Sequence, residues 1–383
     1  MLKTKNLFSL LALAIIFVSA CSKTETPGSW SVMDTGTSDA FYSVNFVDEN
    51  NGWLNGHTDR SYIPSAEELA NANANANKNA KPKTPKDKID DPLKSNQGFE
   101  VLHSTDGGRT WKQIPDQFKH KIRSVWFVDT QTGWALTIDR DILHTADGGA
   151  SWALQRKAGT TKLKLRDSRG ERVTDAPEQI DQIYFLDAAR GWAWGGGRKD
   201  SYSEQPGILL STVDGGMNWN EVPYPFDNDL SAIFFLNANH AWASTKSGFF
   251  HTSDGGLNWA RVQTRLPEEL FYSIFFLDES NGWVVGRSGR MAKTSDGGVT
   301  WTRITRDMVR VEFVMRDIYF IDRDHGWAAG EKGMILYTDD GGDNWTSVPS
   351  PFPEQFTDVM FVNRRAGWIA GLNGAALRLE PAD

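Results

Sequence analysis

One turn motif, repeated six times, constrains the fold of this chain more than any other feature. Each copy reads Asp-Gly-Gly-x-x-Trp with a Ser or Thr two residues before the Asp, and the copies occupy residues 104–111, 145–152, 212–219, 252–259, 294–301 and 338–345. A Gly-Trp pair alternates with them, at 52–53, 133–134, 191–192, 282–283, 326–327 and 367–368, with Ala241-Trp242 as the variant. The last four of these tryptophans are 41, 44 and 41 residues apart. That spacing is the length of one four-stranded propeller blade.

Each period reads as four short strands. In one example, an apolar run at 317–322 is followed by a turn, a second run at 326–330, a third at 334–338, and a fourth after Trp345. Runs of about five residues bounded by glycine favour strands, and no amphipathic helical stretch of useful length competes with them. The sequence therefore predicts an all-β fold.

The two ends of the chain explain why there are seven Gly-Trp units but only six Asp turns. The last unit has three strands before the sequence ends, whereas Gly28-Ser29-Trp30 reads like the end of an Asp turn followed by a fourth strand. If residues 28–34 complete the last blade, the ring closes without an open sheet edge. We therefore expect a single seven-bladed β-propeller of four-stranded blades over residues 28–383.

The Asp turns have the chemistry of a scaffold. Their carboxylates can accept hydrogen bonds from the following backbone N–H groups, and the glycines can adopt positive φ angles. Thirteen of the sixteen tryptophans belong to the two motifs, which indicates packing. Calcium sites need six to eight oxygen ligands, more than these turns offer. We expect no metal or cofactor, and a structural role for Asp106, Asp147, Asp214, Asp254, Asp296 and Asp340.

The N-terminus predicts export and lipidation. Lys3 and Lys5 precede an apolar run at 7–20, which is too short to span a membrane and ends at Cys21, the only cysteine. This resembles a bacterial lipoprotein signal, with a signal peptide at 1–20, acylation of Cys21 and a linker at 21–27. Ser22 in place of Asp favours the outer membrane in a Gram-negative cell. An ordinary signal with a chance cysteine, or an uncleaved anchor, is the alternative.

Charge narrows the class of partner. Without residues 1–20, 39 Lys and Arg face 49 Asp and Glu, a net charge of −10. An acidic balance argues against nucleic acid, because phosphate binding needs a basic surface. With a single cysteine the chain can form no internal disulfide, so a large core must hold the fold.

Three irregular insertions, at 58–97, 159–178 and 197–206, fall in loops that a propeller places on one face, opposite the Asp turns. Loops on a rigid scaffold commonly carry function, so we take this face as the working one. The first insertion is rich in Ala-Asn and Lys/Pro, and an expansion without a role explains it equally well. The second is basic and fits a small hairpin or lid.

Seven positions begin the innermost strands on that face: Tyr42, Arg123, Asp181, Ser231, Tyr272, Arg316 and Thr357. Arginines gathered there by an acidic chain predict an acidic or carboxylate-bearing partner. A solvated surface with scattered charges is the alternative. The candidate partner-binding residues, including those of neighbouring loops, are Arg123, Arg265, Tyr272, Arg287, Arg290, Arg306, Arg310 and Arg316.

The turns resemble the Asp-box, or bacterial neuraminidase repeat. Their alternation with "FVD…GW…G" is similar to a narrower group, the propellers of photosystem II assembly and stability factors and their relatives in non-photosynthetic bacteria. The resemblance covers Gly28 to Leu379. It implies a monomeric, membrane-tethered, non-catalytic binding protein with an arginine-rich patch, whose partner is a protein or a membrane complex under assembly.

Two other functional classes are alternatives to a binding protein. A sialidase-like glycoside hydrolase, or a carbohydrate-binding propeller, shares the Asp-box. Sialidases have six blades and an Arg-Ile-Pro segment that this chain lacks, although Tyr272, Glu312 and Arg316 can be drawn as a site. Tandem-propeller glucanases need two propellers. A metal or redox carrier lacks ligands, because the seven histidines are dispersed and the one thiol is expected to be acylated.

Overall fold

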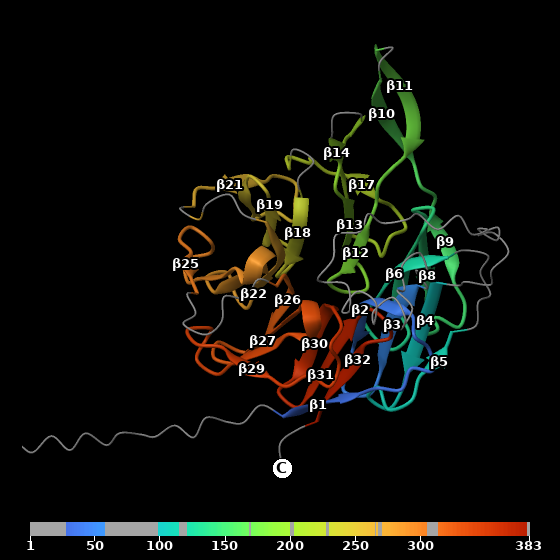
Figure 1. Ribbon diagram of the computed structural model, residues 1–383. Helices are drawn as coiled ribbons and strands as arrows, with labels where there is room; N and C mark the ends of the chain where they lie inside the picture. The colour runs from blue at the N-terminus through green and yellow to red at the C-terminus, as the bar shows by residue number, and fades with distance from the viewer. Residues whose placement is uncertain are drawn as a thin grey trace, which may run out of the picture.

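The computed structural model describes residues 28–57, 99–114, 121–167, 170–199, 203–226, 230–264, 266, 270–304 and 313–380. Over these residues the chain forms eight four-stranded antiparallel sheets and no α-helix. The sheets of the repeat surround a common centre, as in a β-propeller, and the first strand of each repeat lies nearest that centre (Figure 1). Two single 3-10 turns complete the structure, η2 (Arg287–Gly289) and η3 (Glu331–Gly333).

Seven of the eight sheets follow the repeat, and in six of them the strands lie in sequence order from the inside outwards. The first three are β2 (Ala40–Phe46), β3 (Gly52–His57), β4 (Phe99–Ser104) and β5 (Lys112–Gln113); β6 (Ile122–Phe127), β7 (Gly133–Thr137), β8 (Ile142–Thr145) and β9 (Ala153–Arg156); β12 (Gln182–Phe185), β13 (Gly191–Gly195), β16 (Ile208–Thr212) and β17 (Asn220–Glu221). The next three are β18 (Leu230–Phe235), β19 (Ala241–Thr245), β20 (Gly248–Thr252) and β21 (Ala260–Val262); β22 (Phe271–Phe276), β23 (Gly282–Gly286), β24 (Met291–Thr294) and β25 (Thr302–Arg303); β26 (Met315–Phe320), β27 (Gly326–Gly330), β28 (Ile335–Thr338) and β29 (Thr346–Val348).

The seventh sheet combines the two ends of the described chain. Its strands β30 (Phe356–Asn363), β31 (Ala366–Gly371) and β32 (Ala376–Glu380) come from the C-terminal repeat, and its outer strand is β1 (Ser29–Val32). Ser29 pairs with Glu380 and Val32 with Leu377. Trp30 is buried and packs edge-on against Trp327, with ring centroids 5.4 Å apart. Its indole therefore fills the place that an Asp-turn tryptophan fills elsewhere.

The eighth sheet is built from two of the insertions. Strands β10 (Thr160–Asp167) and β11 (Gly170–Pro177) form a hairpin that projects from the body (Figure 1). The hairpin pairs with β15 (Ser203–Gln205), which also pairs with β14 (Arg198–Lys199). Segments 159–178 and 197–206, separate in sequence, thus meet in one arm.

Neighbouring sheets are joined by stacked aromatic rings. In six of the repeated sheets, the phenylalanine that ends the first strand stacks closely on the Gly-Trp indole of the preceding sheet; in the seventh, Phe361 of β30 lies farther from Trp327, at 5.6 Å. Ring centroids are 3.4–4.0 Å apart in six pairs, Phe46–Trp368, Phe127–Trp53, Phe185–Trp134, Phe235–Trp192, Phe276–Trp242 and Phe320–Trp283. Each pair buries two of the largest side chains in the core. The Phe46–Trp368 pair joins the first full sheet to the last.

The glycine of the Gly-Trp pair is required by this stacking. A Cβ at Gly282 would lie 2.6 Å from the ring of Phe276, and the corresponding glycines are equally close to their phenylalanines. Where Ala241 replaces glycine, Phe235 stacks on Trp192 less tightly, at 4.0 Å with 19° between the ring planes. The sequence variant at 241–242 is therefore accommodated by a tilted ring.

The six Asp turns share one set of hydrogen bonds, seen for example at Asp254. Its Oδ1 accepts from Thr252 and from the amide of Asn258, while Oδ2 accepts from the side chain of Asn258. Gly255 and Gly256 have φ of 73° and 95°, angles that favour glycine. Burial opposes ionisation of Asp106, but hydrogen bonds from Thr110, Ser104 and a backbone amide lower its pKa to about 2. The turns therefore stay charged and locked at ordinary pH.

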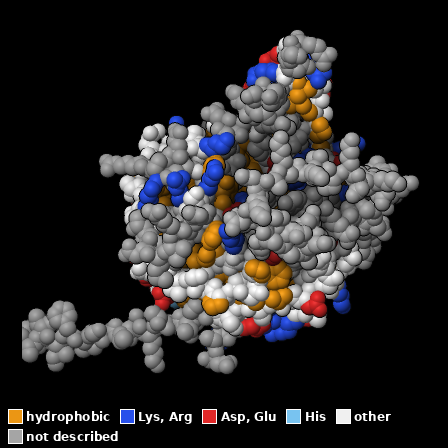
Figure 2. Space-filling model, in the orientation of Figure 1, with side chains coloured by type: hydrophobic (Ala, Val, Ile, Leu, Met, Phe, Trp, Pro, Cys, Tyr) orange, Lys and Arg blue, Asp and Glu red, His pale blue; other side chains and the backbone are white. Residues whose placement is uncertain are grey.

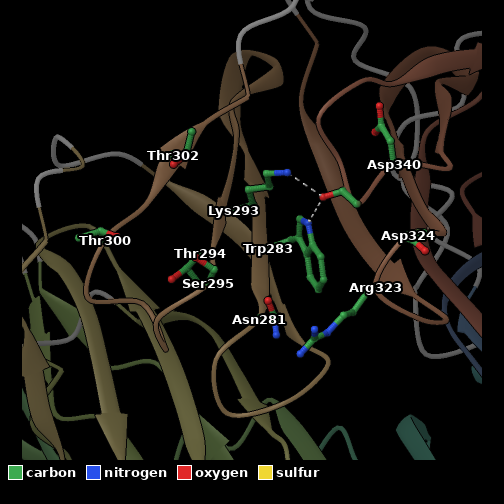
Figure 3. A pocket seen from close by; sticks show the side chains of 11 residues that line it. Asn281, Trp283, Lys293, Thr294, Ser295, Thr300, Thr302, Arg323, Asp324 and Asp340 are labelled. Carbon is green, nitrogen blue, oxygen red and sulfur yellow. Dashed lines mark hydrogen bonds between the residues drawn. The ribbon is translucent and has the colours of Figure 1, made fainter. Parts of the chain in front are cut away.

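A tryptophan N–H also ties each of five sheets to the Asp turn of another. Trp283 Nε1 donates to the carbonyl oxygen of Gly341 over 3.0 Å, and Lys293 Nζ approaches the same oxygen (Figure 3). Trp134, Trp192, Trp242 and Trp368 donate to Gly215, Gly255, Gly297 and Gly107 in the same way.

Among the described residues, no helix has the length and apolar character needed to cross a membrane.

Candidate functional site

The seven positions singled out at the start of the inner strands share one structural feature. Six of them are the extra residue of a β-bulge in the pairing of the first and second strands: Tyr42, Arg123, Ser231, Tyr272, Arg316 and Thr357. The seventh, Asp181, directly precedes β12. Bulges re-aim a side chain away from the regular pleat and are common beside functional sites. We call these seven the rim residues.

On one part of the rim, two arginines share one carboxylate. Arg123 Nη2 and Arg140 Nη1 each lie 2.9 Å from Oδ1 of Asp181. Burial and the charge of Arg123 lower the pKa of Arg140, while Asp181 opposes this. Arg140 also donates to the backbone oxygen of Ile180 and so braces the start of β12. The three side chains carry one net positive charge.

A cavity of about 240 Å³ opens beside this cluster. Its walls come from β2, β3, β6 and the start of β12, and include Tyr42, Asn55 and Arg123. Tyr42 is 41% exposed and Asn55 only 1%. The cavity therefore has an accessible aromatic edge and a polar floor.

A second arginine site lies on β22 and β26. The guanidinium of Arg316 lies over the ring of Tyr272, 5.0 Å from its centroid, and Nη2 is 3.2 Å from Glu331. Cation–π contacts of this kind hold a guanidinium flat against a ring. The η2 turn contacts β26 and carries exposed Arg287, with exposed Arg290 directly after it. Lys and Arg side chains gather over β19, β22 and β26 on the visible face (Figure 2).

The structure thus describes five of the eight candidate partner-binding residues. Tyr272, Arg287, Arg290 and Arg316 belong to neighbouring elements, whereas Arg123 lies on β6 with the shared carboxylate. Arg265, Arg306 and Arg310 lie outside the described residues, as do Cys21 and the insertion 58–97. Sequence reasoning did not find Arg140 or Asn55. Asn55 had a signal, because apolar residues occupy its position in most other repeats.

Two carboxyl groups lie one residue beyond the rim, on β26 and β30. Asp317 accepts from the hydroxyl of Ser273 over 2.6 Å and from the amide of Val359 over 2.9 Å. Asp358 accepts from the amide of Val44 and donates a hydrogen bond to Asp317. Burial raises the pKa of Asp358 well above its usual range, and the charge of Asp317 adds to the effect. The pair therefore shares a proton and joins four inner strands.

A different cavity, of about 250 Å³, lies on the Asp-turn side between the sheets of β23 and β27. Figure 3 shows Lys293 and Arg323 among the side chains that line it. Lys293 Nζ is 2.7 Å from Asp343, and Arg323 pairs with Asp278 at 3.4 Å. Both cations are thus engaged in joining sheets, as the Trp283 indole is.

The repeated four-stranded sheet, the Asp turns and the Phe–Trp stacks define an Asp-box β-propeller. A sequence profile of the family described as photosynthesis system II assembly factor YCF48 matches residues 215–309 and 263–351. The curated Photosystem II assembly lipoprotein Ycf48 of Synechococcus sp. (strain CC9902) is 28% identical over 152 residues, which is 39% of this chain and 39% of that protein. These matches show that part of the chain is similar to the Ycf48-like propellers.

Solved structures agree on the fold. A structure of YCF48 bound to D1 peptide has a TM-score of 0.65 at 18% identity and covers 94% of this chain and 96% of that one. YCF48 from Cyanidioschyzon merolae gives 0.63 at 18% identity, with 93% and 100% covered. An ancestral GH74 enzyme gives 0.57 at 12% identity, with 90% and 45% covered. The propeller architecture is thus shared by binding proteins and enzymes, so function must be argued from the site.

Proposed function

We propose that this chain is a non-catalytic, lipid-tethered binding protein of the cell envelope, which holds a polypeptide segment of a membrane complex under assembly. The observation that carries the proposal is the bulged rim, where Arg316 stacks on Tyr272 beside the exposed Arg287 and Arg290. Arginine and tyrosine are the residue types that dominate protein-binding hot spots. A solved relative holds a peptide, which supports a polypeptide as the ligand.

A binding role accounts for Tyr272 better than a catalytic one. A nucleophilic tyrosine needs a base within hydrogen-bond reach, whereas Tyr272 has the guanidinium of Arg316 over its ring face. Arg316 is itself held by Glu331. A fixed, stacked guanidinium suits recognition of a carboxylate or a backbone oxygen. The likeness to a GH74 enzyme supports only the fold.

We also propose that the seven repeated sheets form a closed seven-bladed ring. The pairing of β1 with β32 and the Phe46–Trp368 stack support closure. Contacts of β2 with β30 and of β2 with β6 support the same order of inner strands. In this arrangement residues 28–380 are one domain, and the rim residues encircle one end of its central axis.

The arginine patch yields a first prediction. Replacing Arg287, Arg290 and Arg316 together with Glu should reduce capture of membrane-complex subunits from an envelope extract at least tenfold, which is about 1.4 kcal/mol of binding free energy. The reason is that a carboxylate-bearing partner, attracted by the arginines, would be repelled by the glutamates. Quantitative mass spectrometry of the captured proteins measures this loss.

The matched control carries the same change of charge on the opposite face. Arg190, Arg323 and Arg365 lie exposed in turns between first and second strands. Replacing these three with Glu should leave capture within about twofold of the unchanged protein, below ~0.5 kcal/mol. Equal losses in the two triple variants would mean that overall charge, and not the rim, governs binding.

The tether gives a second prediction. Cys21→Ala removes the thiol that accepts the lipid, so labelling with a fatty-acid analogue should cease and the protein should leave the membrane fraction. Cys21→Ser is the matched control, because it keeps the size and polarity of the side chain while also lacking the thiol. Membrane retention of both variants would overturn lipid tethering and leave the rim proposal intact.

A further inference from the structure

The cavity beside Arg123 contains hydrogen-bonding atoms that have no partner among the described residues. Asn55 is 1% exposed and lines the cavity, yet its Oδ1 accepts no hydrogen bond from the described residues. Ser43, on the adjacent strand β2, also lines the cavity, and its buried Oγ has no hydrogen-bond partner in the part of the chain that the structure describes. A buried acceptor that receives no hydrogen bond lowers the stability of the folded protein. A ligand in the cavity that donates hydrogen bonds would explain why these two side chains are present.

Comparison among the repeats shows that Asn55 is unusual. It is the fourth residue of its second strand, a position filled elsewhere by Leu136, Trp194, Ser244, Val285, Ala329 and Ala370. Only Ser244 among these is polar, and its hydroxyl donates to the backbone oxygen of Phe271 at the start of the next sheet. Asn55 Nδ2 approaches the matching oxygen of Ile122, at 3.5 Å. A serine could make that contact, so the extra Oδ1 of Asn55 serves something else.

The charges around the cavity restrict its occupant. Arg123, Arg140 and Asp181 together carry one positive charge, which disfavours a cation. An anion would be drawn to Arg123 but would face the lone pairs of Asn55 Oδ1, so it is disfavoured as well. A neutral group with an N–H donor and an oxygen acceptor satisfies both ends, the acceptor on Asn55 and the donor on Arg123.

We propose that this cavity binds a carboxamide side chain, Asn or Gln, of the polypeptide held on the rim. The carboxamide N–H₂ donates to Asn55 Oδ1 and Ser43 Oγ, its oxygen accepts from Arg123, and its methylene stem packs on the exposed ring of Tyr42. The proposal rests on the proposed function and adds to it a sequence preference. In this arrangement the arginines around Arg316 attract the polypeptide, and the cavity beside Arg123 selects one uncharged residue of that polypeptide.

The direct test uses small probes with the purified full chain. N-acetyl-glutamine methylamide is compared by saturation-transfer NMR with N-acetyl-norleucine methylamide, which has the same backbone and an apolar side chain. The expected affinity for a probe this small is roughly millimolar. We expect saturation of the glutamine side-chain protons at least about threefold above that of norleucine. Equal saturation of the two probes, or stronger saturation of methyl glucoside, overturns the proposal.

Two variants test whether the preference for glutamine over norleucine comes from the cavity. Asn55→Leu keeps the shape but removes the acceptor together with the long Nδ2 contact to Ile122. It should abolish the glutamine preference with little change in the Tm, because the buried Oδ1 that lacked a hydrogen bond is removed as well. Ser43→Ala should weaken the preference and leave the Tm unchanged, because the Ser43 hydroxyl makes no hydrogen bond with the described residues. Ser244→Ala, at the matched position of another repeat, should lower the Tm and keep the preference. A glutamine preference that survives in both Asn55→Leu and Ser43→Ala overturns the assignment.

Failure of this proposal can be told apart from failure of the proposed function. If the rim holds a polypeptide but the cavity does not select a carboxamide, the Asn55→Leu protein captures the same envelope proteins as the unchanged chain. The triple Glu variant of the arginine patch still loses them. If the rim holds no polypeptide, neither the arginine variant nor Asn55→Leu changes what is captured.

Discussion

Replacing Trp368 with Ala is expected to lower the free energy of unfolding by about 3–5 kcal/mol, the range for a large aromatic removed from a packed core. The indole is 1% exposed and stacks on Phe46 at 3.5 Å with 4° between the ring planes. Its N–H donates to the carbonyl oxygen of Gly107. The change therefore leaves a cavity and an unpaired carbonyl at the contact between the first full sheet and the last. Urea unfolding monitored by fluorescence measures the loss.

Trp283 provides the matched control. It stacks on Phe320 at 3.6 Å and donates to Gly341, in the same geometry but between two sheets that are consecutive in sequence. In a closed ring the two substitutions should cost nearly the same, because these two boundaries have the same stacked pair and the same indole hydrogen bond. A loss below about 1 kcal/mol for Trp368→Ala, beside a full loss for Trp283→Ala, would show that the ring is open.

The carboxyl pair should respond unequally to two chemically identical substitutions. Asp317→Asn is expected to cost about 2–4 kcal/mol, because its N–H₂ group replaces one of two oxygens that both accept hydrogen bonds. Oδ1 accepts from Ser273 and Oδ2 from Val359, and Asp358 donates to the same carboxylate. Asp358→Asn should change stability by less than about 1 kcal/mol near pH 5, because the amide keeps a donor toward Asp317 and an acceptor for Val44. Thermal and urea unfolding of the two variants measure the difference.

The same pair predicts a pH dependence with a defined sign. The pKa of Asp358 is higher in the folded chain than in the unfolded one, because burial and the charge of Asp317 disfavour its ionised form. The proton is therefore bound more tightly by the folded state, and the stability it confers is complete below the usual Asp range and lost as pH rises through the folded pKa. Asp358→Asn removes this loss.

The measurement is the free energy of unfolding of both proteins at several pH values from about 4 to about 9. The advantage of Asp358→Asn over the unchanged protein should grow with pH and then level off. A difference that stays constant across this range would mean that Asp358 is ionised throughout, contrary to the proton-sharing pair. Asp317→Asn should remain the less stable variant at every pH.

The local elements could be predicted from sequence because each is dictated by nearby residues. The Asp-Gly-Gly turns need positive φ at their glycines, and their flanking runs have the length and composition of strands. The rim positions followed from aligning repeats, since the bulge recurs at the same place in six of them. The family resemblance rests on the same repeats and is confirmed by the comparisons.

Features that depend on contact between sheets could not be predicted in this way. Nothing near Trp283 in sequence indicates that its indole reaches Gly341, or that Phe320 lies on its face. The hydrogen bond between Asp317 and Asp358 joins residues from successive repeats. Arg140 was missed because it lies in the short turn between β7 and β8, where its positive φ of 69° directs it toward Asp181. Spatial neighbours of this kind require coordinates.

The pairing of β1 with β32 sets an order of events when the chain is synthesised. Residues 29–32 are made before every repeat, but their partners at 377–380 follow only after those repeats. Until then β1 has no partner strand, and β32 lacks its outer neighbour. Contacts so distant in sequence form late and slowly, and exposed strand edges invite association with other chains. The incomplete sheet therefore has to be shielded while the rest of the chain is made, and a chain released before residue 376 would carry that exposed edge permanently.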